Sequence, residues 1–202
     1  MSGWPEPVTL TGPHATLVPL ALDHHDGLVE AARDGELWRL WYTAVPSPEG
    51  MAAEIQRRLA LAATGSMRPF TVFDTSPAGG GRTAGMTTYM HIDATHRRVE
   101  IGSTWTRASC QRTPLNTQCK RLLLGHAFEA LDCIAVEFRT HRLNTQSRRA
   151  IERLGAQLDG ILRAHLRGPD GSLRDTAVYS ITAAEWPTVR QHLDWQLSKP
   201  RR

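Results

Sequence analysis

A short segment just before a predicted helix carries groups that suit an anion. It reads Gln111-Arg112-Thr113-Pro114-Leu115-Asn116-Thr117. The first amides of a helix have no intrahelical partner and carry the positive end of the helix dipole, so together they suit a diphosphate. Lys120 and Arg121 add charge in the first turn, where cations oppose the dipole and make more sense if an anion binds. An ordinary helix cap formed by Asn or Thr explains the same residues.

A second segment, residues 141–155, offers a hydrogen-bonding amide. Asn144 stands where it can cap the following helix, and its amide can equally bond an amide-containing ligand beside the preceding strand. Capping alone is a sufficient explanation of this residue. Both segments follow a carboxylate, Glu100, on a predicted strand, and it is the combination in this order that indicates a functional site.

Hydrophobic spacing and turn-forming residues indicate the elements that position these groups. Helices are predicted over residues 27–41 (with Gly35 as an interruption), 47–63, 116–131, 144–154 and 184–197. Strands are predicted over residues 70–73, 85–92, 99–106, 133–140, 157–167 and 174–182. Gly155 suits a left-handed helix cap, and residues 168–172 suit a tight turn. This order is a mixed α/β pattern in which antiparallel hairpins flank a central βαβ unit.

The composition narrows the class of protein. The 202 residues suit a single domain, and 41% hydrophobic with 22% charged residues is close to the globular average. No apolar run approaches the roughly 20 residues of a membrane span, and the N-terminus lacks the pattern of a secretory signal, so a cytoplasmic protein without a membrane partner is expected. Three cysteines without close pairing indicate reduced thiols.

The net charge of +4 suits an anionic partner, either a phosphorylated cosubstrate or a nucleic acid. The basic residues are scattered and no nucleic-acid-binding motif is present, so nucleic acid is the weaker expectation. We interpret the basic tail from Lys199 to Arg202 as a solvated chain end.

Several runs of the sequence resemble one family. They are Glu100-Ile101-Gly102, the helix opening at Asn116, the strand over 133–140, Asn144-x-x-Ser147 leading into Arg149-Ala150-Ile151-Glu152-Arg153-Leu154-Gly155, and the closing strand over 173–180. Over residues 9–186 the chain resembles the GNAT superfamily of N-acetyltransferases, and within it the ribosomal-protein-alanine N-acetyltransferases. The resemblance implies an α/β fold with a mostly antiparallel sheet, one splayed parallel strand pair and flanking helices, followed by a C-terminal helix and tail over 184–202.

The same resemblance implies acetyl-CoA as the donor. Its pantetheine arm would lie between the two parallel strands, and its pyrophosphate would lie at the helix opening. The residues implied to contact it are Ser103, Thr104, Trp105, Thr106, Arg112, Thr113, Leu115, Asn116, Thr117, Asn144 and Arg149. The family pattern Q/R-x-x-G-x-G/A is changed here to Gln111-x-x-Pro114-x-Asn116. Proline has no N–H to donate, and asparagine adds a side chain where backbone normally approaches phosphate.

Acetyl transfer to an amine needs a base for the amine proton and an acid for the departing thiolate. The resemblance implies Glu100 as the base, although an alternating strand can carry the same carboxylate on its surface. It implies Ser147 as the acid, and a hydroxyl that stabilises the first helical turn is the alternative. Tyr179 is a further candidate acid, with core packing as its other role. Cys119 lies on an apolar stripe without a neighbouring base, so direct attack is favoured over a covalent enzyme.

Three aromatic residues stand close together at the end of the first predicted helix, and the resemblance implies that the first helices roof the acceptor side. We expect Trp38, Trp41 and Tyr42 to line the acceptor site, with core packing as the alternative. The sequence does not distinguish a protein N-terminus from a polyamine, an amino acid or an aminoglycoside as the primary amine. No metal site is proposed. A homodimer is compatible with the fold, and a non-catalytic CoA-binding or sensing module is the alternative function because both glycine positions are changed.

Overall fold

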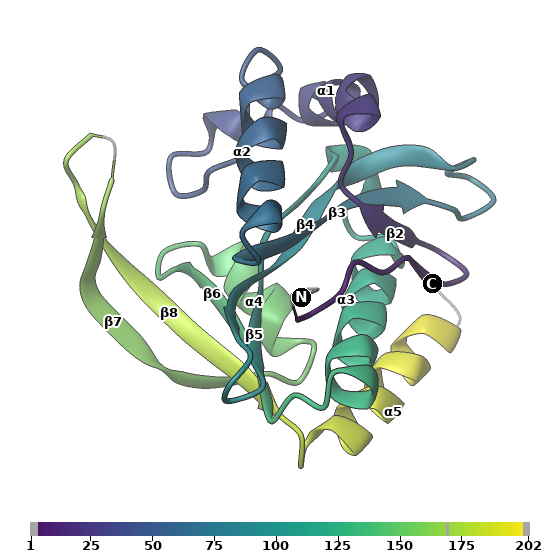
Figure 1. The fold of residues 1–202 in the computed structure, drawn as a ribbon, viewed down its shortest axis with the longest axis vertical. Coiled ribbons are helices and arrows are strands. Elements are labelled where there is room, and N and C mark those ends of the chain that lie inside the picture. The colour runs from purple at the N-terminus through teal and green to yellow at the C-terminus, as the bar shows by residue number, and fades with distance from the viewer. Residues whose placement is uncertain (1–3, 169, 200–202) are drawn as a thin grey trace.

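One mixed β-sheet forms the centre of the computed structural model, which describes residues 4–168 and 170–199 (Figure 1). The sheet has eight strands in the order β1-β2-β3-β4-β5-β6-β8-β7, and β5 and β6 are its parallel neighbours. The strands are β1 (Leu10–Thr11), β2 (Thr16–Pro19), β3 (Met67–Asp74), β4 (Arg82–Asp93), β5 (Arg98–Thr106), β6 (Ala135–His141), β7 (Gln157–Arg167) and β8 (Leu173–Thr182). The hairpin of β7 and β8 projects from the body (Figure 1).

Helices cover both faces of the sheet. They are α1 (His25–Arg33), α2 (Met51–Ala63), α3 (Leu115–Gly125), α4 (Thr145–Glu152) and α5 (Trp186–Ser198). α1 and α2 enclose a small hydrophobic cluster with Met86 of β4 and Trp105 of β5. The side chains of Tyr89 and Val99 belong instead to a larger cluster with α3, α4 and α5. The two clusters therefore lie on opposite sides of the sheet. None of the helices in the described part of the chain is long and apolar enough to cross a membrane.

The helix α4 shows how local sequence defines an element that lies beside the site. Asn144 caps it by accepting a hydrogen bond from the Ser147 amide (3.0 Å). Its apolar face is buried in the larger cluster through Ile151. Gly155 follows the helix with φ +99°, a conformation that glycine adopts without strain, and a Cβ there would lie 3.1 Å from Val189 of α5. The left-handed cap predicted at Gly155 is confirmed.

The parallel strands β5 and β6 pair along only part of their length. Their register joins Arg98 to Ala135, Val99 to Val136 and Glu100 to Glu137, and there the pairing ends. Beyond it β5 continues to Thr106 and β6 to His141. Between Gly102 and Trp105 a β-bulge shifts the register of β5 against β4, and Ser103 in the bulge has φ +47°. The predicted splayed parallel pair is confirmed, as is the mixed sheet with flanking helices.

The prediction of one helix over residues 27–41 is wrong. α1 ends at Arg33, and Asp34 has an extended conformation. The Asp34 carboxylate accepts hydrogen bonds from Arg107 Nε (2.9 Å) and Ser109 Oγ (2.6 Å), so tertiary bonds override the helical spacing. A single 3₁₀ turn, Leu37–Arg39, follows. Trp38, Trp41 and Tyr42 therefore belong to the segment between α1 and α2 and not to a helix face.

Other boundaries differ by smaller amounts. The sequence prediction lacks β1 and β2, which are only two and four residues long. α2 begins at Met51 because the Ser47 hydroxyl caps the preceding turn at the Gly50 amide (3.2 Å). The helix predicted over 116–131 is α3 followed by a π-helical turn, His126–Ala130. The tail predicted to be solvated lies outside the described residues beyond Lys199.

Candidate active site

Glu100 is the last residue of β5 that pairs with β6, and beyond it the two parallel strands separate. Its side chain is only 5% exposed. Glu100 Oε2 is joined to His91 Nδ1 at 2.7 Å, and Arg139 Nε lies 3.5 Å from the same oxygen. The His91 side chain is 59% exposed, so a buried carboxylate is connected to solvent through an imidazole. A buried, hydrogen-bonded carboxylate beside an opening in the sheet is suited to proton transfer.

Several charged side chains share one face of the sheet with Glu100. Direct strand partners point to the same face, and so do alternate residues along a strand. Glu100 is paired with Glu137, and Thr176 of β8 is paired with His141 of β6. We call this surface the Glu100 face, and it comprises Glu100, Glu137, Arg139, His141, Arg174 and Thr176. Of these residues, only Glu100 belongs to the site predicted from the sequence.

Glu137 occupies the position opposite Glu100 and is held by two arginines. It forms an ion pair with Arg98, and Arg139 Nη2 donates to its second oxygen at 2.9 Å. Arg139 therefore lies between two carboxylates and contacts both. The negative charge of Glu137 is therefore balanced by Arg98 and Arg139. Glu100 contacts Arg139 as well, but its shortest contact is with His91, which is exposed to solvent.

His141 closes the same face at the end of β6. Its Nδ1 accepts a hydrogen bond from the Leu143 amide (3.0 Å), so in the neutral ring Nε2 carries the proton. Burial and then the nearby Arg174 lower the pKa of His141, which favours the neutral ring. The Trp41 ring packs edge-on against His141 with centroids 5.1 Å apart. His141 thus presents a neutral N–H donor beside an aromatic wall.

The three predicted acceptor-site aromatics separate into two groups. Trp38 packs against the smaller hydrophobic cluster under α1 and α2. Trp41 is 68% exposed and contacts both His141 and Tyr42, whose ring centroid is 5.6 Å away. Trp41 and Tyr42 therefore lie beside the Glu100 face, and Trp38 has the core role that the sequence left as an alternative.

Two threonine side chains at the start of α3, Thr113 and Thr117, are hydrogen-bonded within the protein. Thr113 Oγ1 donates to the Cys110 carbonyl (2.7 Å) and accepts from the Leu115 amide (3.3 Å). Thr117 is buried, and its hydroxyl accepts from Arg153 Nη2 (3.1 Å). Arg112 is exposed with φ +60°. Because the Leu115 amide donates to Thr113, the groups best placed for a phosphate are the backbone amides of Asn116 and Thr117, with Arg153 beside them.

Lys120 and Arg121 have partners within the protein. Lys120 Nζ is buried under the β5 bulge, where it donates to Thr104 Oγ1 (2.8 Å), and burial lowers the pKa of Lys120 to about 8. Arg121 pairs with Asp194 of α5 (2.7 Å). These two cations therefore do not by themselves indicate a bound anion. Lys120 instead contacts the strand predicted to face the pantetheine arm, which sequence reasoning missed.

The α4 side of the opening contains the predicted amide and hydroxyl groups. Asn144 uses its Oδ1 for the helix cap, which directs its NH2 group away from that bond, and no partner for the NH2 is found among the described residues. Ser147 is half-buried in the first turn, and Arg149 is exposed. The Tyr179 hydroxyl donates to Glu152 (2.7 Å) and accepts from Arg148 Nε (2.8 Å). Because Tyr179 is fully buried in these bonds, the structure favours its core role.

The three cysteines, Cys110, Cys119 and Cys133, are free and buried, as the sequence predicts. Burial raises the pKa of Cys119 to about 12 and that of Cys133 to about 11. Burial and the neighbouring Asp74 also raise the pKa of Cys110. Thiols in these surroundings stay protonated near neutral pH and are poor nucleophiles.

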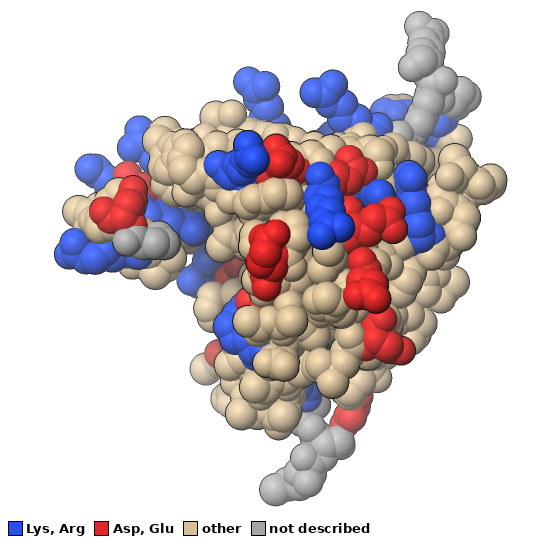
Figure 2. Space-filling model, turned by 90° about the horizontal axis from the view of Figure 1, so that it is seen from above, with Lys and Arg blue, Asp and Glu red and all other residues tan. Residues whose placement is uncertain are grey.

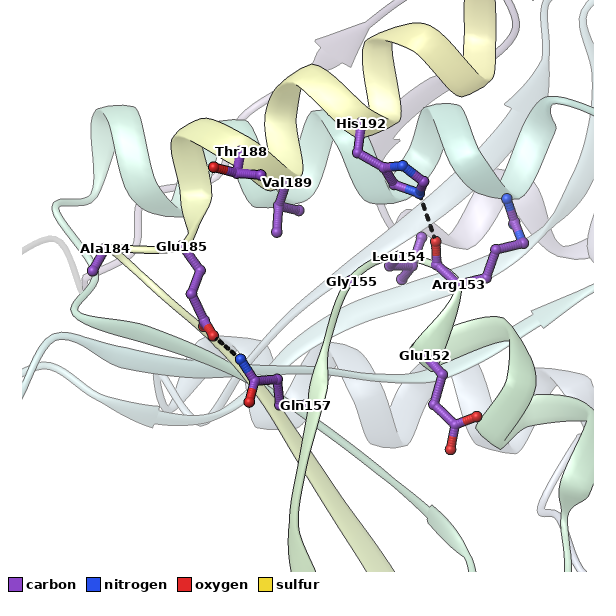
Figure 3. Close-up of a pocket in the computed structure, with 10 residues that line it drawn as sticks. All are labelled: Glu152, Arg153, Leu154, Gly155, Gln157, Ala184, Glu185, Thr188, Val189 and His192. Atoms are coloured by element: carbon purple, nitrogen blue, oxygen red, sulfur yellow. Dashed lines mark hydrogen bonds between the residues drawn. The ribbon is translucent and has the colours of Figure 1, made fainter.

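A separate cavity of about 700 Å³ lies between the end of α4, the start of β7 and α5 (Figure 3). In Figure 3 His192 of α5 points toward the Arg153 carbonyl, and Gln157 points toward Glu185. Its helices belong to the cluster on the side of the sheet away from α1 and α2. Arg153 lines this cavity and also reaches Thr117, so the cavity adjoins the start of α3 and not the Glu100 face.

The opening between β5 and β6 fits the donor that the sequence suggests. Strand edges that lose their partner present free N–H and C=O groups, which can pair with the amides of a pantetheine arm. The start of α3 follows β5 and the start of α4 follows β6, and Gln146 of α4 donates to Gln111 (3.4 Å), so both helix starts lie toward the ends of the two strands that separate. Pro114 is the N-cap of α3, so the missing N–H lies outside the first turn.

Comparisons with known proteins assign the family. Residues 14–157 match the family model described as an acetyltransferase (GNAT) domain. A structure from T. thermophilus assigned to the acetyltransferases is 33% identical, with a TM-score of 0.82 over 96% of this chain and 99% of that one. A GCN5-related N-acetyltransferase from Brucella melitensis is 30% identical, with a TM-score of 0.82 over 96% and 87%. No curated protein sequence matches the chain.

A more distant structure shares the fold. It is the Salmonella typhimurium acetyl transferase that modifies the N-terminal serine of the 50S ribosomal protein L7/L12, and it is 17% identical, with a TM-score of 0.75 over 87% of this chain and 99% of that one. The splayed parallel pair and the family match together define an acyl-CoA-dependent transferase fold. The chain belongs to the GNAT acetyltransferase family and is an acetyl-CoA-dependent acetyltransferase.

Proposed function

We propose that this protein transfers the acetyl group of acetyl-CoA to a primary amine by direct attack within a ternary complex. The observation that carries the proposal is the position of Glu100, buried at the point where β5 and β6 part and connected through His91 to solvent. A carboxylate in that position can deprotonate an amine that approaches from the Glu100 face, while the thioester approaches through the opening.

The predicted donor contacts follow from the same opening. The backbone of Ser103, Thr104, Trp105 and Thr106 and the NH2 of Asn144 would bind the pantetheine arm. The segment from Arg112 to Thr117, which leads into the first turn of α3, would bind the pyrophosphate through its backbone amides, with Arg149 and Arg153 supplying charge. Support for this arrangement comes from the internal bonds of Thr113 and Thr117, which leave the backbone as the main donor set.

We assign one residue to remove the proton from the amine and another to supply the proton to the thiolate. Glu100 takes one proton from the attacking nitrogen as the new C–N bond forms, and His91 passes it to solvent. Ser147 gives a proton to the sulfur as the C–S bond breaks and regains one from solvent. The products are the N-acetyl amine and the free thiol, so no proton is gained or lost overall. The buried thiols give no reason for an acyl-enzyme step.

Initial rates distinguish the ternary complex from a covalent route. Thiol release is measured while acetyl-CoA and the amine are varied in turn. We expect double-reciprocal lines that intersect, because both substrates must be bound before the acetyl group moves. Parallel lines together with a trapped acetyl-enzyme would contradict direct attack.

A non-catalytic CoA-binding or sensing module is the second candidate, favoured by the changed residues Pro114 and Asn116. Isothermal titration with acetyl-CoA and thiol release over a panel of amines separate the two. Binding with amine-dependent thiol release supports the transferase. Binding with no release for any amine favours the module.

A further inference from the structure

Arg174 differs from Arg139, the other arginine of the Glu100 face, because it has no partner among the described residues. Its Nε is buried and has no hydrogen-bond acceptor among the described residues, and Arg174 forms no ion pair within that part of the chain. The neighbouring arginines differ: Arg139 pairs with Glu137 (2.9 Å), and Arg142 and Arg163 both pair with Asp175 (3.3 Å). The local acidic groups are therefore distributed among the other arginines.

The register places Arg174 next to the His141–Thr176 pair on the Glu100 face. Thr176 is the partner of His141, and Arg174 lies two residues before it on the same face of β8. Across the hairpin Arg174 is paired with Leu166, which is 48% exposed. Burial lowers the pKa of Arg174, Glu100 acts against that shift, and Arg174 in turn lowers the pKa of His141. These couplings place the guanidinium within electrostatic range of both Glu100 and His141.

A buried guanidinium N–H without an acceptor costs free energy, and such groups persist where a ligand completes the bond. The guanidinium fork matches a carboxylate in geometry and charge. A phosphate dianion would suffer stronger repulsion from Glu100 than a carboxylate does. The hairpin of β7 and β8 projects from the body at the left of Figure 2, with blue side chains along it.

We propose that Arg174 binds a carboxylate of the acceptor, so that the acceptor is an amine that also carries a carboxylate close to its amino group. This inference rests on the proposed amine acetylation and assigns the substrate class of the same site. Arg174 would hold the carboxylate while Glu100 faces the amine. A free acidic amino acid and a peptide with an acidic residue next to its N-terminus share this chemistry.

The test uses matched acceptors that differ only in carboxylate against amide. One pair is glutamic acid 1-amide and glutaminamide, and the other is the dipeptide amide Ala-Asp-NH2 and Ala-Asn-NH2. In the unmodified protein we expect kcat/KM to favour the carboxylate member of at least one pair by roughly 10- to 100-fold. The pair with the larger ratio of the two kcat/KM values shows whether the acceptor is a small amine or a peptide. Equal values in both pairs would overturn the inference.

Arg174→Met removes the fork, and Arg163→Met is the matched control because Arg163 lies on the same hairpin and is 80% exposed. We expect Arg174→Met to bring the carboxylate-to-amide ratio close to one, and Arg163→Met to preserve it. If Arg174 only balanced the charge of Glu100, both members of each pair would lose the same factor and the ratio would remain, which contradicts the inference.

The inference and the proposed function fail in different ways. If no amine is acetylated, the proposed function fails, and carboxylate binding is then measured directly by titrating N-acetyl-Ala-Asp-NH2 and N-acetyl-Ala-Asn-NH2 into the protein with CoA present. Tighter binding of the Asp compound, lost in Arg174→Met, supports the carboxylate site. Equal binding of the two compounds overturns it.

Discussion

The start of α3 and the Glu100 face lie at the same opening in the sheet but use their polar groups differently. At α3 the hydroxyls of Thr113 and Thr117 are occupied within the protein, which leaves backbone amides for a ligand. On the Glu100 face, Arg174 and the Nε2 of His141 have no partner among the described residues. We therefore expect the donor to be recognised mainly by backbone and the acceptor mainly by side chains. Sequence change can alter the acceptor without disturbing the donor.

The largest expected effect is on the acceptor side, where Glu100 is the proposed base. Glu100→Gln keeps the shape of the side chain but cannot take a proton, so kcat/KM for the amine should fall by roughly 10²- to 10⁴-fold with the KM for acetyl-CoA nearly unchanged. Glu137→Gln is the matched control, because Glu137 is the direct strand partner of Glu100. Rates are measured by thiol release, and circular dichroism verifies the fold. Similar losses in the two variants would mean that Glu100 is not the base.

On the donor side, the buried position of Lys120 beneath Thr104 can be tested through the pH dependence of the free energy of unfolding. The pKa of Lys120 is lowered from 10.5 to about 8 in the folded protein, so between those values the unfolded chain binds a proton that the folded chain does not. The free energy of unfolding should therefore rise with pH across this window, by about 3 kcal/mol in total relative to Lys120→Met.

Denaturant unfolding at a series of pH values measures the Lys120 effect. Arg121→Met is the control, since Arg121 pairs with Asp194 at the neighbouring position of α3. Its stability curve should run parallel to that of the unmodified protein. If the curve of Lys120→Met also runs parallel, Lys120 is not held in the buried position beneath Thr104.

Much of the fold is predictable from the sequence because its signals are local. The hairpin of β7 and β8 follows from its turn residues, and the end of α4 follows from Gly155. The end of α1 could not be predicted, because it depends on bonds from Asp34 to Arg107 and Ser109, more than 70 residues away. The strands β1 and β2 are too short to show a hydrophobic pattern in the sequence. They form because they pair with each other and with β3.

The site was predictable to a lesser degree for the same reason. Glu100 and Asn144 are predicted from the sequence because their places in the order of elements carry a family pattern. His91 lies near Glu100 only through the β4–β5 hairpin, where its neighbour Met90 is the partner of Glu100. Arg174 and Lys120 could not be recognised without knowing which face of the sheet or helix each occupies. Strand alternation from Glu137 to His141 is the one signal that sequence reasoning could have used.

Asn144 gives the smallest expected effect and separates a structural role from a binding role. Asn144→Ala removes both the cap and the amide, and should lower the free energy of unfolding by about 1 kcal/mol. Asn144→Asp keeps an oxygen for the Ser147 amide but has no NH2, so stability should change little while the KM for acetyl-CoA rises roughly 3- to 10-fold. Thermal unfolding and thiol-release kinetics measure the two effects. An unchanged KM in Asn144→Asp would restrict this residue to its cap.

The central claim is that the donor enters between β5 and β6 where their pairing ends and meets the amine on the Glu100 face. A crystal structure of the protein with bound CoA tests it most directly. We predict the pantetheine arm along residues 103–106, the pyrophosphate on the first amides of α3 and the thiol directed toward the Glu100 face. A closed seam beyond Glu100 and Glu137, or CoA seated wholly in the cavity between α4 and α5, would contradict the account.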